Sequence, residues 1–226
     1  MEKIIILDLK FKFGEAEDVI HPVVVKSDDS MILVDCGYTG SLQKLEVEMH
    51  QKGLDCEALT HVFITHQDHD HMGALAELKG KYPHILVVAS EQEAPYISGE
   101  LKSLRLAQAE QMQAYLPEEQ KAFGKAFCDI IRAVKPVPVD IKVKDADVVA
   151  GCTIVESTGH TPGHISVYVK SARTLITGDA VALENGKPVI ANPQFTLDLK
   201  GAEASLNKIL NYDADQVICY HGGVLT

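Results

Sequence analysis

The chain has 226 residues, of which 46% are hydrophobic, and a formal net charge of −11. That length and hydrophobic share suffice for one domain with a substantial core. The negative charge disfavours nucleic acid and anionic membranes as partners. No apolar stretch approaches the roughly 18 residues that a membrane span needs. We therefore expect a single domain, residues 1–226, that acts on a small-molecule substrate.

The cysteines and the N-terminus bear on the compartment. Five cysteines are scattered along the chain without a C-x-x-C pair, a pattern typical of reduced thiols rather than of a disulfide framework. The apolar run at residues 4–7 is too short for a signal peptide. We expect a cytoplasmic protein, and a homodimer is compatible with the sequence.

The first ninety residues predict strands and helices in alternation. Runs rich in Ile and Val, bounded by Gly or by Asp and Ser, predict strands. Ser41 and Gly53 are suitable caps for a helix between them. The expected elements are strands at 3–9, 21–26 and 31–34, a helix at 41–52, a strand at 61–65, a helix at 73–78 and a strand at 85–89.

Residues 91–134 differ in character and predict a helical insertion. Leu101, Leu104, Met112 and Tyr115 indicate one amphipathic helix that ends near Pro117. A second helix is indicated by residues spaced at i, i+4, i+7 and i+8, namely Phe123, Phe127, Ile130 and Ile131. Two interpretations remain open: these helices cover a sheet, or they form a cap over an active site.

The last third of the chain returns to strands. We expect strands at 153–156, 165–170 and 174–177, a helix at 199–210 and a strand at 216–220. Strands before and after a helical middle favour an α+β fold, with two sheets packed face to face and helices outside.

Residues 66–71 carry the most informative pattern, His66-Gln-Asp68-His69-Asp70-His71, which follows an apolar strand. A folded protein seldom gathers so many imidazoles and carboxylates unless they hold a cation. Three later stretches also place a metal-ligand type directly after a predicted strand. They are Glu156-Ser-Thr-Gly-His160-Thr-Pro-Gly-His164, Leu175-Ile-Thr-Gly-Asp179 and Val217-Ile-Cys-Tyr-His221-Gly-Gly.

These stretches resemble the motifs of the metallo-β-lactamase superfamily, in the family's order, with Val34-Asp35-Cys36-Gly37 matching an early one. The resemblance covers nearly the whole chain. It implies a four-layer αββα sandwich with a two-metal site at one edge. Within the superfamily, the chain is similar to the glyoxalase II-like and lactonase-like branch.

The resemblance also implies a role for each motif residue. His66, Asp68 and His160 would hold a first metal, and Asp70, His71 and His221 a second. Asp179 would bridge the two metals, and Asp35 would support the site from below. Asp70 and Asp179 are then the expected catalytic residues, because Asp70 could also orient the bridging hydroxide.

Asp68 departs from the family pattern, which has histidine more often at that position. An added carboxylate favours harder cations such as iron or manganese, although zinc remains compatible. We expect two divalent metal ions, with zinc favoured and iron or manganese as alternatives. His69 is an alternative ligand to Asp68, but neighbouring positions of an extended loop point to opposite sides.

The implied activity is that of a metal-dependent hydrolase. A dinuclear centre with a bridging hydroxide would cleave an ester, a thioester, a lactone or a similar small molecule. A first alternative is a diiron redox enzyme that resembles the flavodiiron core, which carries a carboxylate at the position of Asp68 and acts on oxygen or nitric oxide. A second is a non-catalytic metal-binding protein, although a purely structural site normally closes with four ligands.

Overall fold

Successive side chains of a strand point to opposite faces of its sheet. In the central strands both faces are apolar and buried. In strand β5 (Met31–Val34) all four residues are buried. Met31 and Leu33 contact the core on one side of the sheet, whereas Ile32 and Val34 contact the core on the other. A strand that is apolar on both faces belongs inside a layered fold, covered from both sides. The structure is a computed structural model, and it describes residues 2–14 and 16–225.

The first sheet has six strands in the order β1-β4-β5-β6-β7-β8. The pairs β1–β4 and β4–β5 are antiparallel, and the pairs from β5 to β8 are parallel. Its remaining strands are β1 (Lys3–Ile6), β4 (Val23–Lys26), β6 (His61–Phe63), β7 (Leu86–Ser90) and β8 (Ile141–Val143).

The second sheet also has six strands, in the order β16-β15-β12-β11-β10-β9. The pair β12–β15 is parallel and the other pairs are antiparallel. Its strands are β9 (Val148–Val149), β10 (Cys152–Glu156), β11 (Ile165–Val169), β12 (Thr174–Ile176), β15 (Gln216–Cys219) and β16 (Gly223–Leu225).

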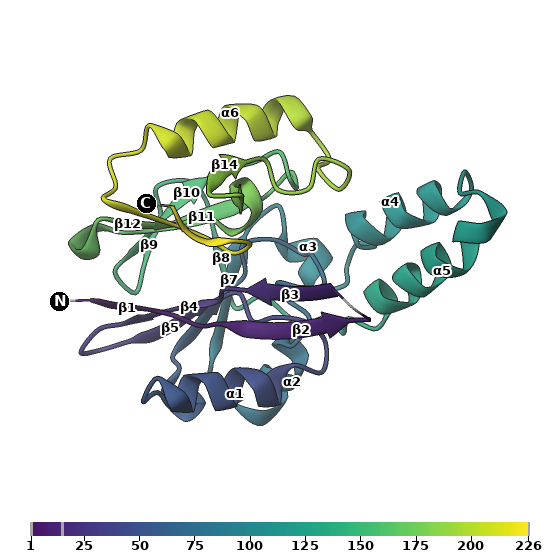
Figure 1. Ribbon diagram of the computed structural model, residues 1–226. Helices are drawn as coiled ribbons and strands as arrows, with labels where there is room; N and C mark the ends of the chain where they lie inside the picture. The colour runs from purple at the N-terminus through teal and green to yellow at the C-terminus, as the bar shows by residue number, and fades with distance from the viewer. Residues whose placement is uncertain (1, 15, 226) are drawn as a thin grey trace.

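Helices cover the outer face of each sheet (Figure 1). Helices α1 (Leu42–Gln51) and α2 (Leu75–Lys81) pack on the first sheet, and α6 (Leu199–Leu210) packs on the second. Between the sheets lies an aliphatic core that includes Phe63 and Ile218. The expected αββα sandwich is therefore confirmed. Short 3₁₀ helices lie at Cys56–Ala58, Lys170–Ala172 and Gly178–Ala180.

Helices also fill the segment in which the insertion was expected. They are α3 (Ala94–Ile97), α4 (Leu104–Gln113) and α5 (Glu118–Arg132). Helices α4 and α5 form a hairpin that projects sideways from the sandwich (Figure 1). Its buried face differs from the expected apolar stripe, because Tyr115 and Phe123 are exposed while Arg105 and Cys128 are buried. An arginine on the buried face needs an anionic partner, and that partner lies in the candidate site.

Most predicted elements occur within a few residues of their expected bounds, and α6 has the bounds expected for it. Two hairpins were missed, β2 (Leu9–Phe13) with β3 (Ala16–Ile20) and β13 (Ala182–Glu184) with β14 (Lys187–Val189). The expected strand at 3–9 splits, since β1 ends at Ile6 and β2 begins at Leu9. All five cysteines are buried free thiols. Among the described residues, no helix is long and apolar enough to cross a membrane.

Candidate metal centre

The candidate ligands come from the ends of strands in both sheets. The loop 66–71 follows β6, His160 follows β10, Asp179 follows β12 and His221 follows β15. Strands β12 and β15 are parallel, so Asp179 and His221 leave the second sheet at the same edge. Gly163 allows the His160 loop to approach the turn after β7, because a Cβ there would lie 2.6 Å from the Gln92 side chain.

Among the described residues, the loops bring the predicted ligands into three overlapping groups, and within each group the ligand atoms lie within 4.8 Å of one another. The first group is His66, Asp68 and His160, the second is Asp70, His71 and His221, and a third, His66, His71 and Asp179, connects them. The first and second groups coincide with the ligand sets that the sequence resemblance implies. That these residues bind metal stays a prediction.

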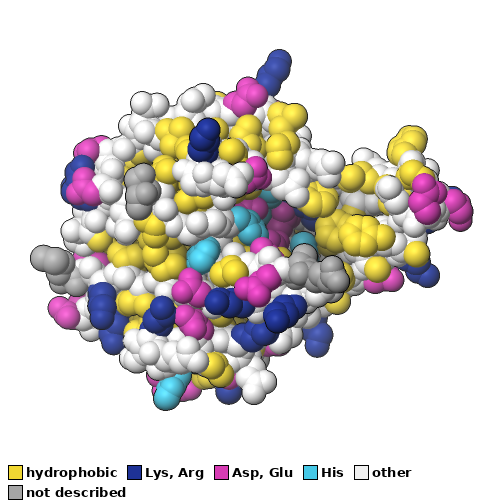
Figure 2. Space-filling model, viewed as in Figure 1, with side chains coloured by type: hydrophobic (Ala, Val, Ile, Leu, Met, Phe, Trp, Pro, Cys, Tyr) yellow, Lys and Arg dark blue, Asp and Glu magenta, His cyan; other side chains and the backbone are white. Residues whose placement is uncertain are grey.

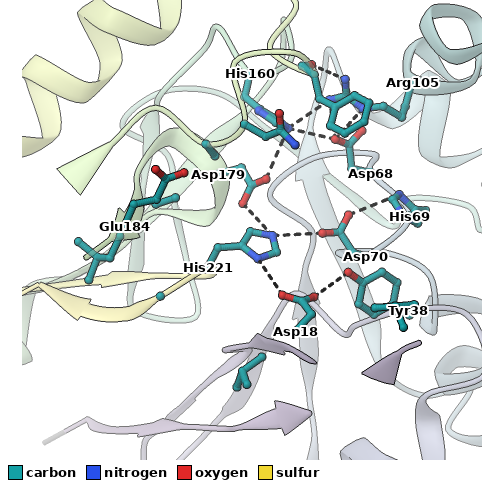
Figure 3. Close-up of a pocket in the computed structure, with 18 of the residues that line it drawn as sticks. Asp18, Tyr38, Asp68, His69, Asp70, Arg105, His160, Asp179, Glu184 and His221 are labelled. Atoms are coloured by element: carbon teal, nitrogen blue, oxygen red, sulfur yellow. Dashed lines mark hydrogen bonds and ion pairs between the residues drawn. The ribbon is translucent and has the colours of Figure 1, made fainter. Parts of the chain in front are cut away.

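Asp179 lies between the two groups (Figure 3). Its Oδ1 is 3.3 Å from His71 Nε2 and 3.6 Å from His221 Nε2, whereas its Oδ2 is 3.5 Å from His160 Nε2. One oxygen therefore faces the second group and the other faces the first. The backbone N–H of Asp179 donates to His164 Nε2 at 3.0 Å, which fixes the residue from the side opposite its carboxylate.

Asp35 and Thr65 orient two of the imidazoles. Thr65 Oγ1 donates to Asp35 Oδ2 at 2.8 Å, so only a lone pair of this hydroxyl faces His66 Nδ1, 3.0 Å away. His71 Nδ1 likewise donates to Asp35 Oδ2 at 2.8 Å. Both rings are therefore held by a hydrogen bond at Nδ1 and turn Nε2 to the centre, the nitrogen that can bind a metal once it has lost its proton.

Several buried polar atoms at the centre lack a hydrogen-bond partner, among them His66 Nε2, His71 Nε2, Asp68 Oδ1 and Asp179 Oδ1. Leaving such atoms unpaired is costly in a folded protein. Burial lowers the pKa of His71. The nearby carboxylates of Asp179, Asp70 and Asp35 outweigh burial and raise this pKa well above its usual value. The pKa of His221 is raised to about 9, because Asp179 and Asp70 outweigh burial. Imidazoles and carboxylates that converge in this way suit divalent cations.

A pocket of about 420 Å³ opens above the ligands. Figure 2 shows the hollow, with imidazoles and carboxylates at its floor and apolar side chains at the base of the α4–α5 hairpin. Phe127 of α5 stacks on Phe195, with ring centroids 5.4 Å apart. The apolar part of the wall is formed by Phe13, Val19, Tyr38, Phe127, Ala182, Leu183, Ala191 and Phe195.

Arg105 of α4 reaches the first group, a contact that the sequence did not predict. Its Nε and Nη2 donate to Asp68 Oδ2 at 3.0 and 2.6 Å. Burial raises the pKa of Asp68. The charge of Arg105, and after it that of His66, outweighs burial and brings this pKa well below its usual range. Asp68 is therefore an anion whose charge is balanced by a buried guanidinium.

Glu93 joins the two ligand loops of the first group. Its Oε2 accepts from the backbone N–H of Gln67 at 3.0 Å, and its Oε1 accepts from Gly163 N–H at 2.9 Å. Gln67 in turn accepts from Leu104 N–H at 2.7 Å, at the first turn of α4. The loop that carries His66 and Asp68 is thus bonded to the insertion at both Glu93 and Leu104.

Asp18 and Tyr38 border the second group (Figure 3). Tyr38 Oη donates to Asp18 Oδ2 at 2.8 Å, and Asp18 Oδ1 lies 4.0 Å from His221 Nδ1. His69, the alternative ligand to Asp68, instead packs edge to face against Tyr38 and Phe127. Sequence reasoning missed Asp18, Tyr38, Glu93 and Arg105. Tyr38 directly follows the motif Val34-Asp35-Cys36-Gly37 but is not a usual metal-ligand type, and the other three do not stand next to a motif.

Comparison with known proteins places this chain in a family. Residues 17–221 match the family described as the Metallo-beta-lactamase superfamily. The chain belongs to that superfamily. It is 26% identical over 208 residues to the "Probable metallo-hydrolase YflN" of Bacillus subtilis, covering 87% of this chain and 77% of that protein. A second probable metallo-hydrolase, from Streptococcus pyogenes, is 23% identical over 190 residues, with 82% and 72% of the two chains covered.

A solved structure supports the same fold. The metallo-beta-lactamase family protein TTHA1429 from Thermus thermophilus superposes with a TM-score of 0.73. The alignment covers 98% of this chain and 74% of that one, at 21% sequence identity. At this identity the likeness shows the fold, and the chemistry has to be argued from the site.

Proposed function

We propose that this protein is a metal-dependent hydrolase whose dinuclear centre cleaves an ester, a thioester, a lactone or a similar small molecule. The observation that carries the proposal is the pair of His/Asp groups on either side of Asp179, at the floor of a pocket. The first metal would be held by His66, Asp68 and His160, and the second by Asp70, His71 and His221. Asp179 would contact both.

Two divalent cations so held would supply hydroxide at neutral pH and an electrophile for a carbonyl oxygen. The chain's own residues prepare the site for that chemistry. Asp35 keeps His71 in the tautomer that ligates through Nε2. The apolar wall of Phe127 and Phe195 excludes water from one side of the pocket and offers a surface for the apolar part of a substrate.

The lining of the substrate pocket suits an uncharged ester with an apolar acyl or aromatic group. Its acidic side chains beyond the candidate ligands are Asp18 and Glu184. Two divalent cations would carry four positive charges against the three carboxylates of Asp68, Asp70 and Asp179, the first of which is already paired with Arg105. The two further acidic groups would offset that excess, so the occupied site would have no strong net charge.

The test uses protein of known metal content. Chain produced in medium with one added metal at a time is analysed for bound zinc, iron and manganese. It is then assayed on a panel of aryl esters, thioesters and lactones. We expect two metals per chain and turnover of at least one substrate class. Metal-loaded protein that hydrolyses no member of the panel would contradict the proposal.

Asp179→Asn is the variant that tests the centre itself. The amide keeps the shape of the side chain but removes the charge that faces both groups. We expect turnover to fall by about 10²- to 10³-fold, the scale seen when a group that stabilises transition-state charge is lost. Circular dichroism should show an unchanged fold. Unaltered activity would show that Asp179 does not contribute to the metal centre.

The carboxylate-rich ligand set also suits iron, which keeps a diiron redox enzyme as the second candidate. Asp68 and Asp70 each contribute a carboxylate to one of the two groups, and Asp179 lies between them with His66 and His71. The iron-loaded protein should consume oxygen or nitric oxide in the presence of a reductant if this function is correct. We expect hydrolysis and not reduction, because Asp68 is bound by a guanidinium that compensates its charge.

A further inference from the structure

Arg105 is a buried cation whose hydrogen-bond donors all have partners near the first ligand group. Nε and Nη2 donate to Asp68 Oδ2, and Nη2 also lies 3.2 Å from His160 Nε2. Nη1 donates to the backbone carbonyl of Phe195 and to Gln108 Oε1. The guanidinium carbon lies 5.2 Å from the centroid of the Phe195 ring. A guanidinium so fully engaged is not available to hold a substrate anion.

The contact falls on one of the two oxygens of Asp68. Oδ2 accepts both Arg105 bonds and also lies 3.0 Å from His160 Nε2 and 3.4 Å from His66 Nε2, whereas the buried Oδ1 has no hydrogen-bond partner among the described residues. The fixed fork of a guanidinium holds a carboxylate in one orientation, which a point charge does not do. The rotation of Asp68 about its side-chain bonds is therefore set by Arg105, which keeps Oδ2 beside the nitrogens of His66 and His160.

The insertion fixes Arg105 in place through the same loop. Gln67, between the ligands His66 and Asp68, accepts from Leu104 N–H at the start of α4. Ser103 Oγ accepts from Leu106 N–H in the same turn. Arg105 is the second residue of α4 and is only 2% exposed. The first turn of α4 is thus anchored to the ligand loop, and that anchor directs the Arg105 side chain at Asp68.

From these contacts we propose that Arg105 is a positioning residue for the first metal: it holds the Asp68 carboxylate in the orientation in which Oδ2 lies beside the nitrogens of His66 and His160, and it balances the charge that Asp68 adds. The inference rests on the proposed dinuclear function. Asp68 and Arg105 then act as a unit. A carboxylate ligand paired with a guanidinium takes the place of a single neutral imidazole. A histidine at position 68 would need no such partner.

The first test removes the guanidinium and measures metal affinity rather than turnover. Arg105→Met keeps a long apolar side chain in α4. Apo-protein is titrated with Co²⁺, whose absorption bands report each site, in competition with a chelator. His160→Ala and His221→Ala assign the bands to the first and second sites. We expect Arg105→Met to weaken the first site by about 10- to 100-fold, the usual effect of losing a residue that orients a ligand. The second site should be unchanged.

Arg132→Met is the matched control. Arg132 lies in α5 of the same hairpin and pairs with Glu110 and Asp129 at the surface. It should bind both metals as the wild-type chain does. If Arg105→Met does not fold, Arg105→Lys replaces it, since the ammonium keeps the charge but lacks the fork. The lysine variant should still weaken the first site by about tenfold.

The second test exchanges the unit as a whole. Asp68→His alone leaves a buried guanidinium without its carboxylate, an unfavourable state. The double variant Asp68→His with Arg105→Met removes that conflict. We expect the double variant to bind the first metal at least tenfold more tightly than either single variant. Removing Arg105 should therefore weaken metal binding at the first site when residue 68 is aspartate and strengthen it when residue 68 is histidine.

Three outcomes would overturn the inference. Arg105→Met could bind both metals as tightly as the wild-type chain, which would make Arg105 a structural contact only. It could bind the first metal more tightly, which would mean that the guanidinium takes the place of a cation. Asp68→His alone could bind as tightly as the double variant. A wild-type chain that binds no Co²⁺ would instead refute the dinuclear centre itself and this inference with it.

Discussion

The two ligand groups that share Asp179 are supported by different parts of the chain. The first, built on His66, Asp68 and His160, is held by residues from the helical insertion, Arg105 and Glu93. Side chains of this group are at most 7% exposed. Residues of the segment 91–134 thus contact the first group, whose side chains are almost fully buried.

The second group depends on the sandwich instead. Asp35, which follows β5, orients His71, and Asp18 of β3 lies beside His221. The His221 side chain is 28% exposed. Changes in the insertion should therefore alter the first site without moving the second, and changes beneath the sheet should do the reverse.

The largest effect that separates the two sites is expected for Asp35→Asn. Its carboxylate accepts from Thr65 N–H, Thr65 Oγ1 and His71 Nδ1. An amide can satisfy only part of this set, because one of its two polar atoms is a donor. Asn is also tolerated at the backbone φ of +58° that position 35 adopts. We expect the second metal to bind about 10- to 100-fold more weakly.

Measurement is by Co²⁺ titration with chelator competition. Asp213→Asn, at a side chain that is 89% exposed, is the control and should behave as the wild-type chain does. Loss of the first metal in place of the second would contradict the division between sandwich and insertion. Because Thr65 links Asp35 to His66, a weaker effect on the first site is compatible with it.

Glu93→Gln should produce the opposite result with a smaller magnitude. The buried carboxylate accepts from Gln67 and Gly163, and an amide nitrogen must face one of these donors. Losing one such bond in the interior costs about 1–3 kcal/mol of unfolding free energy. The two loops of the first group would separate at that point, and we expect the first metal to bind about tenfold more weakly.

A neighbouring residue supplies the control for Glu93. Glu91→Gln changes the same functional group at a side chain that is 49% exposed and pairs only with Lys144. It should leave both the thermal midpoint and metal affinity unchanged. A Glu93→Gln protein that is less stable but binds both metals normally would show that Glu93 supports the fold and not the site.

The sequence indicated the candidate ligands but not the residues that contact them, for a physical reason. Each candidate ligand follows an apolar strand within a few residues, which marks its position in the chain, and the family resemblance implied its role. The Arg105–Asp68 contact instead joins residues 37 positions apart. An arginine in a helix is expected at the surface by default. The spacing of Leu101 and Tyr115 therefore suggested the wrong buried face for α4.

The β2–β3 hairpin was missed for a related reason. Lysine and phenylalanine alternate in β2, and Phe13 is exposed at the pocket. A hairpin with so little burial has a weak hydrophobic signal. Tyr38 and Phe127 contribute to the same pocket from distant parts of the chain. The substrate wall is thus a product of tertiary structure, and local sequence pattern does not indicate it.

The smallest effect is expected for a substitution in the apolar wall of the pocket. It tests whether the insertion also contacts the substrate. Phe127 of α5 lines the pocket, whereas Phe123, one turn earlier in the same helix, is 78% exposed. Phe127→Ala should raise the KM for esters with an apolar acyl group about 5- to 30-fold, since burying an aromatic ring against a ligand contributes about 1–2 kcal/mol.

Phe123→Ala is the matched control, because it removes the same side chain from the same helix outside the pocket. Co²⁺ affinity should be normal in both variants, which separates substrate contact from ligand positioning. An equal rise in KM for the two variants would mean that the hairpin acts through its stability and not through the pocket. If only Phe127→Ala raises KM, the insertion contributes to both functions of the site: Arg105 positions a metal ligand and Phe127 contacts the substrate.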